Sequence, residues 1–174
     1  YFGSMPKAVP WESYMRNVVA KHNFRFGHYS MGNVPRCSYA DKMRMYAQSK
    51  VSVVHGLCNI NPETAQRYRD FPKGTENEAF QYLEKGWAPQ IKSRMFEAAF
   101  ARSLILCQKM ELNPIERFFT PDQDFLYFED EKDLDRVLTY VLENYDFFDK
   151  MRESAYNKAC TEYTTKSFVQ KYLR

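Results

Sequence analysis

Hydrophobic residues along this chain form two patterns, short continuous runs and positions that repeat every three to four residues. Continuous apolar runs occur at Val51–Val54, at Leu104–Cys107 and at Phe125–Phe128. Runs this short and this apolar are typical of strands that are buried on both faces of a parallel sheet. Phe24–Tyr29 instead alternates bulky and polar side chains, so we predict a half-buried strand there.

The segments between these runs carry helix signals. Ser38 and Asp41 have the form of a capping box and predict a helix over Tyr39–Ser49. Its buried residues should be Met43, Tyr46 and Ala47. Further helices are predicted over Ser13–Lys21, Glu63–Arg69, Asn77–Lys85, Phe147–Ala159 and Phe168–Leu173, with a helical turn over Pro114–Phe119.

The most regular helical pattern follows Asp130, which with Asp133 caps the start of the helix. Its apolar residues recur at helical spacing at Leu134, Val137, Leu138, Val141 and Leu142. Strands separated by helices predict one α/β domain over residues 5–174, with a parallel sheet, flanking helices and a helical C-terminal tail. Residues 1–4 are expected to be the remnant of an expression tag, and residues 57–90 an insertion over the site.

The composition narrows the class of protein. The chain is 44% hydrophobic and 17% aromatic, which predicts a folded core, and it has no apolar run of the roughly 20 residues that span a membrane. A net charge of +3 is too small to predict a nucleic-acid partner. Four widely spaced cysteines indicate reduced thiols and a cytoplasmic protein without a zinc site.

A basic, polar segment leads into a helix in the stretch from Gln90 to Cys107. Ser93 is the predicted N-cap, which would leave the amide groups of Arg94, Met95 and Phe96 free at the helix start. Such a start binds phosphate through its amides and its dipole. Lys92 and Arg94 add full positive charges at the same place, so a diphosphate would fit there.

Glu97 lies one turn further on, among apolar neighbours on the same helix. A carboxylate held near the core in this way can accept hydrogen bonds from a ribose diol. The alternative is an ordinary surface ion pair along the helix with Arg94 or Arg102. Spacing alone leaves both interpretations open.

His55 and Gly56 directly follow the strand Val51–Val54. Open α/β sheets bind their ligands outside the carboxyl ends of the strands, so His55 could contact a bound phosphate. A histidine that merely closes the strand is the other interpretation.

The order of these parts resembles that of a known family. Tyr46–Val54, then Arg94–Phe100, then Phe118–Phe119 and the helix from Glu131 are similar to the C-terminal half of GT-B glycosyltransferases. The resemblance covers residues 38–173 and is greatest to the CgeB-like group of the family 1/4 type. Pro89 and Arg102 stand where relatives have a glutamate and a glycine.

The resemblance implies a Rossmann-like domain that binds a nucleotide-diphosphate sugar and transfers its glycosyl group to a carbohydrate or glycoconjugate acceptor. Glu97 would hold the donor ribose, Lys92, Ser93 and Arg94 would lie against the pyrophosphate, and His55-Gly56 would line the sugar side. It further implies metal-independent catalysis with no cofactor, and a second GT-B domain, in cis or in trans, because residues 1–37 are too few to form one. No catalytic base is identified.

Two other classes were weighed against this interpretation. A non-catalytic α/β interaction module descended from such a domain would have Glu97 and Arg94 paired with each other on the surface, whereas donor binding places both at an open cleft. A flavodoxin-like or receiver-type domain is disfavoured because the strand ends show neither an acidic pocket nor a glycine-rich phosphate loop.

Overall fold

A computed structural model describes residues 17–22, 38–61, 63, 86–110 and 112–172. Its centre is a parallel sheet of the strands β1 (Val51–Val54), β4 (Leu104–Gln108) and β5 (Leu126–Phe128), in the order β1-β4-β5. All three strands fall where the sequence predicted them. The predicted strand at 24–29 lies outside the described residues.

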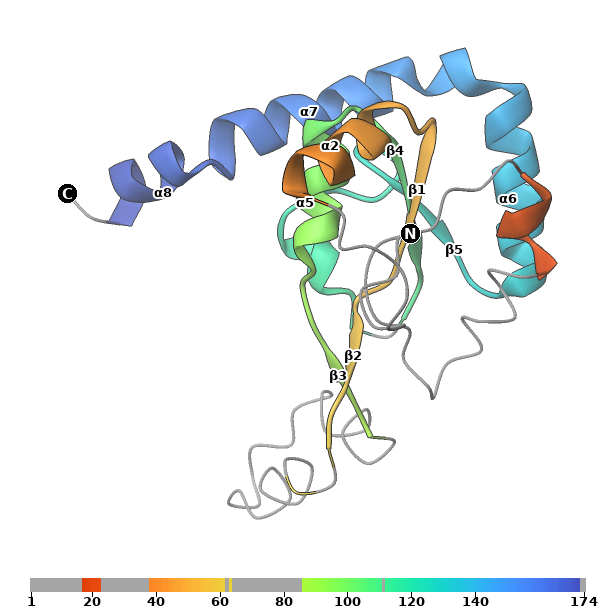
Figure 1. Ribbon diagram of the computed structural model, residues 1–174, viewed down its shortest axis with the longest axis horizontal. Helices are drawn as coiled ribbons and strands as arrows, with labels where there is room; N and C mark the ends of the chain where they lie inside the picture. Colours follow the sequence, from red (N-terminus) through yellow and green to blue (C-terminus); the bar gives the residue numbers. More distant parts are fainter. Residues whose placement is uncertain (1–16, 23–37, 62, 64–85, 111, 173–174) are drawn as a thin grey trace.

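Helices cover both faces of this sheet, which gives the three layers of a Rossmann-like arrangement (Figure 1). Side chains alternate along β4, because Leu104 and Leu106 pack toward α6 (Glu131–Glu143) while Ile105 and Cys107 pack toward α5 (Ser93–Phe100) and α7 (Asp149–Glu162). Both faces of β4 are therefore buried. This explains why the strand appears in the sequence as an unbroken apolar run.

The helix α5 connects neighbouring parallel strands. β1 and β4 pair from Val51 with Leu104 to Val54 with Cys107, and α5 precedes β4 in the chain. A crossover helix between parallel neighbours runs back along the sheet. The amino end of α5 consequently lies at the carboxyl ends of β1 and β4, where this fold class binds ligands.

The predicted helix caps are confirmed. Ser38 precedes α2 (Tyr39–Ala47) and its side chain accepts from the Asp41 amide, and Asp130 does the same for α6 through the Asp133 amide. Leu134, Leu138 and Val141 are buried in α6. The prediction for α2 was partly wrong, because Tyr46 is buried but Ala47 is exposed.

A two-stranded antiparallel ribbon extends beyond the carboxyl end of β1. It consists of β2 (Leu57–Asn59) and β3 (Trp87–Pro89), and it projects away from the sheet (Figure 1). The ribbon forms the two ends of the segment predicted to be an insertion. The helices predicted at 63–69 and 77–85 lie almost entirely outside the described residues. Of the helix predicted at 13–21, residues 17–21 are described, and they include a 3₁₀ turn, η1 (Val19–Lys21).

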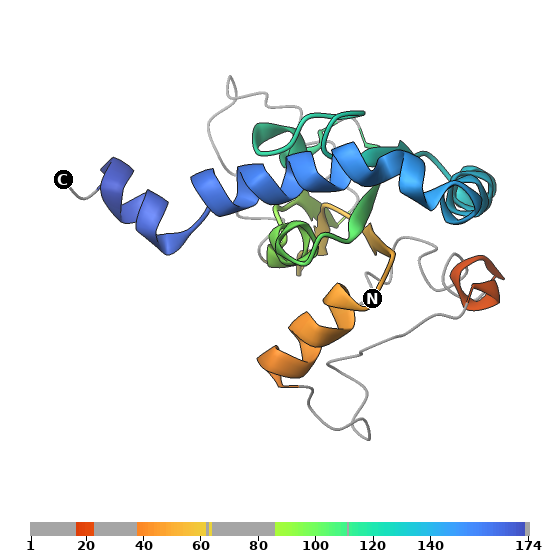
Figure 2. The same ribbon diagram turned by 90° about the horizontal axis from the view of Figure 1, so that it is seen from above.

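The chain ends in a helical tail, as predicted. The 3₁₀ helix η2 (Pro114–Arg117) and the turn after it lead into β5, and η3 (Tyr145–Phe148) leads from α6 into α7. The last helix, α8 (Thr165–Tyr172), continues past the end of α7 and away from the sheet in both views (Figures 1 and 2). Within the described ranges, no helix has the length and apolar character needed to cross a membrane, and Cys58, Cys107 and Cys160 are free thiols.

Candidate functional site

The carboxyl end of β1 meets the segment that enters α5. The Gln90 amide donates to the Gly56 carbonyl at 2.7 Å, and Leu57 pairs with Pro89 in the ribbon. A side chain at Gly56 would stand 3.2 Å from the Met110 methyl carbon and 3.3 Å from the ring of Pro114. Glycine thus permits a close approach between the end of β1 and the chain that follows β4.

His55 is buried directly after β1, near two cationic side chains. It is only 1% exposed, and its Nδ1 accepts from the Leu57 amide at 3.3 Å. Burial, followed by the positive charges of Arg94 and Lys92, lowers the pKa of His55 to about 3. Because Nδ1 is an acceptor, the neutral imidazole carries its proton on Nε2.

The lowered pKa of His55 predicts a specific pH dependence of stability. At a pH above the ordinary histidine pKa of about 6.5, His55 makes its full contribution to the free energy of unfolding. As the pH falls toward 3, His55 becomes protonated in the unfolded state but stays neutral in the folded state. The free energy of unfolding therefore decreases by up to about 1.4 kcal/mol per pH unit. The His55→Asn variant, in which the amide oxygen can replace Nδ1 as acceptor, should lack this slope in urea unfolding between pH 7 and 4.5. Parallel stability profiles of the variant and the wild-type protein would contradict the prediction.

The start of α5 differs in register from the prediction. Lys92, not Ser93, is the N-cap, and its side chain makes no capping hydrogen bond. Ser93 is the first helical residue and is exposed. The Met95 amide, predicted to be free, donates to the Lys92 carbonyl at 3.0 Å. The sequence favoured Ser93 because serine is a common N-cap, but here the extended backbone of Lys92 begins the helix.

Lys92 and Arg94 lie close enough to affect each other and His55. Burial lowers the pKa of Lys92, the nearby Cys58 opposes this shift, and the charge of Arg94 adds to it. The Lys92 ammonium donates to the Gln90 side chain. The structure thus brings His55, Lys92 and Arg94 together at one end of the sheet.

Glu97 is buried on the side of α5 that faces α2. Its side chain is 9% exposed, and its Oε1 lies 2.6 Å from the Lys42 ammonium. Its Oε2 is buried and has no hydrogen-bond partner in the described part of the chain. Glu97 is therefore held near the core, as predicted, whereas the predicted alternative of a surface ion pair with Arg102 is wrong. Ribose binding stays a prediction. The carboxylate pairs with another helix, and Arg102 pairs with Glu153 instead, at 2.6 Å.

Arg102 occupies the position where the resembled family has a glycine, and its backbone explains that preference. Its φ is +55°, in the left-handed region that glycine adopts most easily. The side chain is fixed by Glu153 and by the ring of Tyr156, whose centroid lies 3.6 Å from the guanidinium carbon. Contacts with α7 thus offset the backbone cost of a non-glycine residue.

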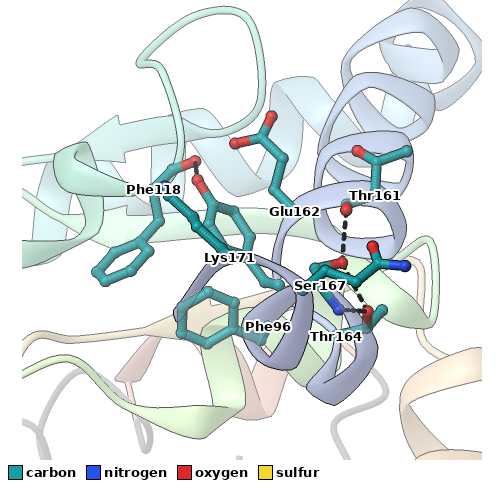
Figure 3. A pocket seen from close by; sticks show the side chains of 9 residues that line it. Phe96, Phe118, Thr161, Glu162, Thr164, Ser167 and Lys171 are labelled. Atoms are coloured by element: carbon teal, nitrogen blue, oxygen red, sulfur yellow. Dashed lines mark hydrogen bonds between the residues drawn. The ribbon is translucent and has the colours of Figure 1, made fainter. Parts of the chain in front are cut away.

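A separate pocket of about 770 Å³ lies between α5 and the turn from α7 to α8 (Figure 3). Its aromatic wall consists of Phe96, Phe118 and Tyr163, whose rings pack edge to face at 5.1 to 5.4 Å. Two hydroxyl groups around the pocket donate hydrogen bonds within the protein. The Tyr163 hydroxyl donates to the Phe118 carbonyl, and the Ser167 hydroxyl donates to the Thr161 carbonyl. None of the predicted site residues lines this pocket.

Sequence reasoning missed two residues near the candidate site. Lys42 pairs with Glu97, and Cys58 lies close to Lys92. Neither belongs to a motif, although Lys42 lies in the helix that the Ser38 cap predicted. The described residues contain no group of three or more His, Cys, Asp or Glu side chains that could bind a metal ion. Metal independence stays a prediction.

Comparison with known proteins identifies the family. The family model described as glycosyl transferase-like matches residues 10–174, most of the chain. A search of curated proteins gives no match. The match agrees with the predicted resemblance and with the Rossmann-like parallel sheet. The chain therefore belongs to the glycosyl transferase-like family.

Proposed function

We propose that this chain is the donor-binding half of a GT-B glycosyltransferase and holds a nucleotide-diphosphate sugar at the carboxyl end of β1. One observation carries the proposal. Lys92 and Arg94 lie at an uncapped start of α5, beside the buried and neutral His55. Two cations at a helix start favour a diphosphate, and a neutral imidazole beside them adds no third charge.

Each site residue has a role in this proposal. Lys92 and Arg94 bind the pyrophosphate, and the exposed Ser93 contributes its backbone at the helix start. Glu97 accepts from the ribose. His55 and Gly56 line the sugar side of the site.

The chemistry proposed for the chain is stabilisation of a leaving group. As the glycosyl bond to the donor breaks, negative charge develops on the departing nucleoside diphosphate. Lys92, Arg94 and the α5 dipole are fixed beforehand where that charge appears, which lowers the barrier without a divalent ion or a cofactor. The base that activates the acceptor, a carbohydrate or glycoconjugate, would come from a second GT-B domain in cis or in trans.

Calorimetric titration with UDP-, GDP- and dTDP-linked sugars tests the proposal. At least one donor should bind with a Kd in the micromolar range, and EDTA should leave that Kd unchanged. An Arg94→Met variant should bind about 10-fold or more weakly, because it loses a charge-assisted contact with phosphate. Absence of binding by every donor up to millimolar concentration would refute donor binding by this chain.

A non-catalytic interaction module is the second candidate function. The observation that favours it is the ion pair of Glu97 with Lys42, because a carboxylate that only joins two helices needs no ligand. This function predicts that no donor binds and that replacing Glu97 changes stability alone. The same titration distinguishes the two functions.

A further inference from the structure

Lys42 and Glu97 form an ion pair across two helices that are far apart in the sequence. The Lys42 ammonium on α2 lies 2.6 Å from Oε1 of Glu97 on α5, and the two side chains are 23% and 9% exposed. Removing a carboxylate from water to this extent is costly unless a cation lies beside it. Lys42 is that cation, and among the described residues it is the ion-pair partner of Glu97.

The position of Lys42 is itself fixed by α2. The helix begins with the Ser38 cap, and the Lys42 ammonium lies 5.2 Å from the centre of the Tyr39 ring. A cation over an aromatic face is stabilised by the charge distribution of the ring. The ammonium is thus held from two sides, by Glu97 and by Tyr39.

The two oxygens of Glu97 are not equivalent. Oε1 is bound to Lys42, while Oε2 is buried and has no hydrogen-bond partner in the described part of the chain. An unsatisfied buried acceptor destabilises the folded protein, and a charged one does so more strongly than a neutral one. A donor group on a ligand would offset this destabilisation. A ligand reaches Oε2 only after the side chains that cover it move aside.

We propose that Lys42 is a positioning residue, which holds Oε1 of Glu97 so that Oε2 is left to accept from a ribose hydroxyl of the donor. The inference rests on the proposed function. It adds that recognition of the ribose depends on α2, a helix that does not itself contain a predicted site residue. A single ammonium on Oε1 is essential, because a guanidinium can bind both oxygens of a carboxylate at once.

The test uses Lys42→Arg and two sets of probes in calorimetric titrations, one with the ribose hydroxyls and one without them. UDP and GDP carry the ribose hydroxyls, while their 2′,3′-dideoxy counterparts and inorganic pyrophosphate lack them. Lys42→Arg retains the charge beside Glu97 but should occupy Oε2 as well. We expect its affinity for UDP or GDP to fall about 10-fold, the size of one hydrogen bond to a charged group. Its affinity for pyrophosphate and the dideoxy nucleotides should change less than about twofold.

Two further variants separate positioning from structural support. Lys42→Met should lower the melting temperature and show the same ribose-dependent loss, whereas Arg44→Met on the same helix removes an exposed pair with Asp41 and should change neither. Wild-type affinity for UDP and GDP in Lys42→Arg, or equal losses for UDP and pyrophosphate, would overturn the positioning role. Failure of the wild-type protein to bind any nucleotide would instead refute the proposed function.

Discussion

Replacing Glu97 with alanine is expected to weaken binding of UDP or GDP by about 100-fold or more. The variant loses a charged acceptor for the ribose, and each hydrogen bond to a charged group contributes about 1.5–3 kcal/mol. It also leaves the Lys42 ammonium without the carboxylate that lies 2.6 Å away. Calorimetric titration of the variant and the wild-type protein measures the loss directly.

Glu153 provides the matched control for this experiment. It is also paired with a basic residue on another element, Arg102 at 2.6 Å, but both side chains are about half exposed. Glu153→Ala should therefore change nucleotide affinity less than about twofold. If Glu97→Ala bound UDP and GDP as tightly as the wild-type protein, Glu97 would be a structural residue alone. The interaction-module function would then be the better account of the family match.

Local signals were sufficient to predict the framework of the fold. Ser38 and Asp130 cap helices where their spacing indicated, because a cap depends only on a side chain and an amide three residues away. The run at β4 was predicted for a similar reason, since a strand buried on both faces needs apolar residues at every position. The same local reasoning wrongly predicted that Ala47 is buried, because the pattern along one helix does not show how far its neighbours extend beside it.

The candidate site was predicted less completely, because its contacts cross the chain. From the sequence, His55 was placed at the carboxyl end of a strand and Lys92 and Arg94 at a helix start, and in the structure both lie at one edge of the sheet. The partner of Glu97 could not be predicted in this way. Lys42 lies 55 residues away in sequence, and its pairing depends on how α2 packs against α5. Spacing along one helix suggested Arg94 and Arg102 instead.

Asp124 is the basis of the second large effect, which concerns stability. Its side chain is fully buried and accepts three hydrogen bonds, from the Lys158 ammonium, from the Ser154 hydroxyl at 2.6 Å and from the Thr120 amide at 2.7 Å. These bonds join the turn before β5 to α7. Asp124→Asn retains the shape but removes the charge, so we expect the free energy of unfolding in urea to fall by about 2 to 3 kcal/mol. Glu129→Gln, which removes an exposed pair with Lys109, should cost less than about 0.5 kcal/mol.

The contribution of Asp124 to the free energy of unfolding should also be lost at low pH. Burial alone would raise the pKa of Asp124, but the hydrogen bonds from Lys158, Ser154 and the Thr120 amide outweigh burial and hold it below its ordinary value. The stabilisation is therefore complete above the unfolded pKa of about 3.9 and is lost as the pH falls through the lower folded value. His55 is intact in both proteins, so its own pH dependence cancels in the difference between the wild-type protein and Asp124→Asn. That difference should be constant from pH 7 to 5 and shrink below about pH 4, and a difference that stayed constant down to pH 2 would show that the charge of Asp124 does not stabilise the turn.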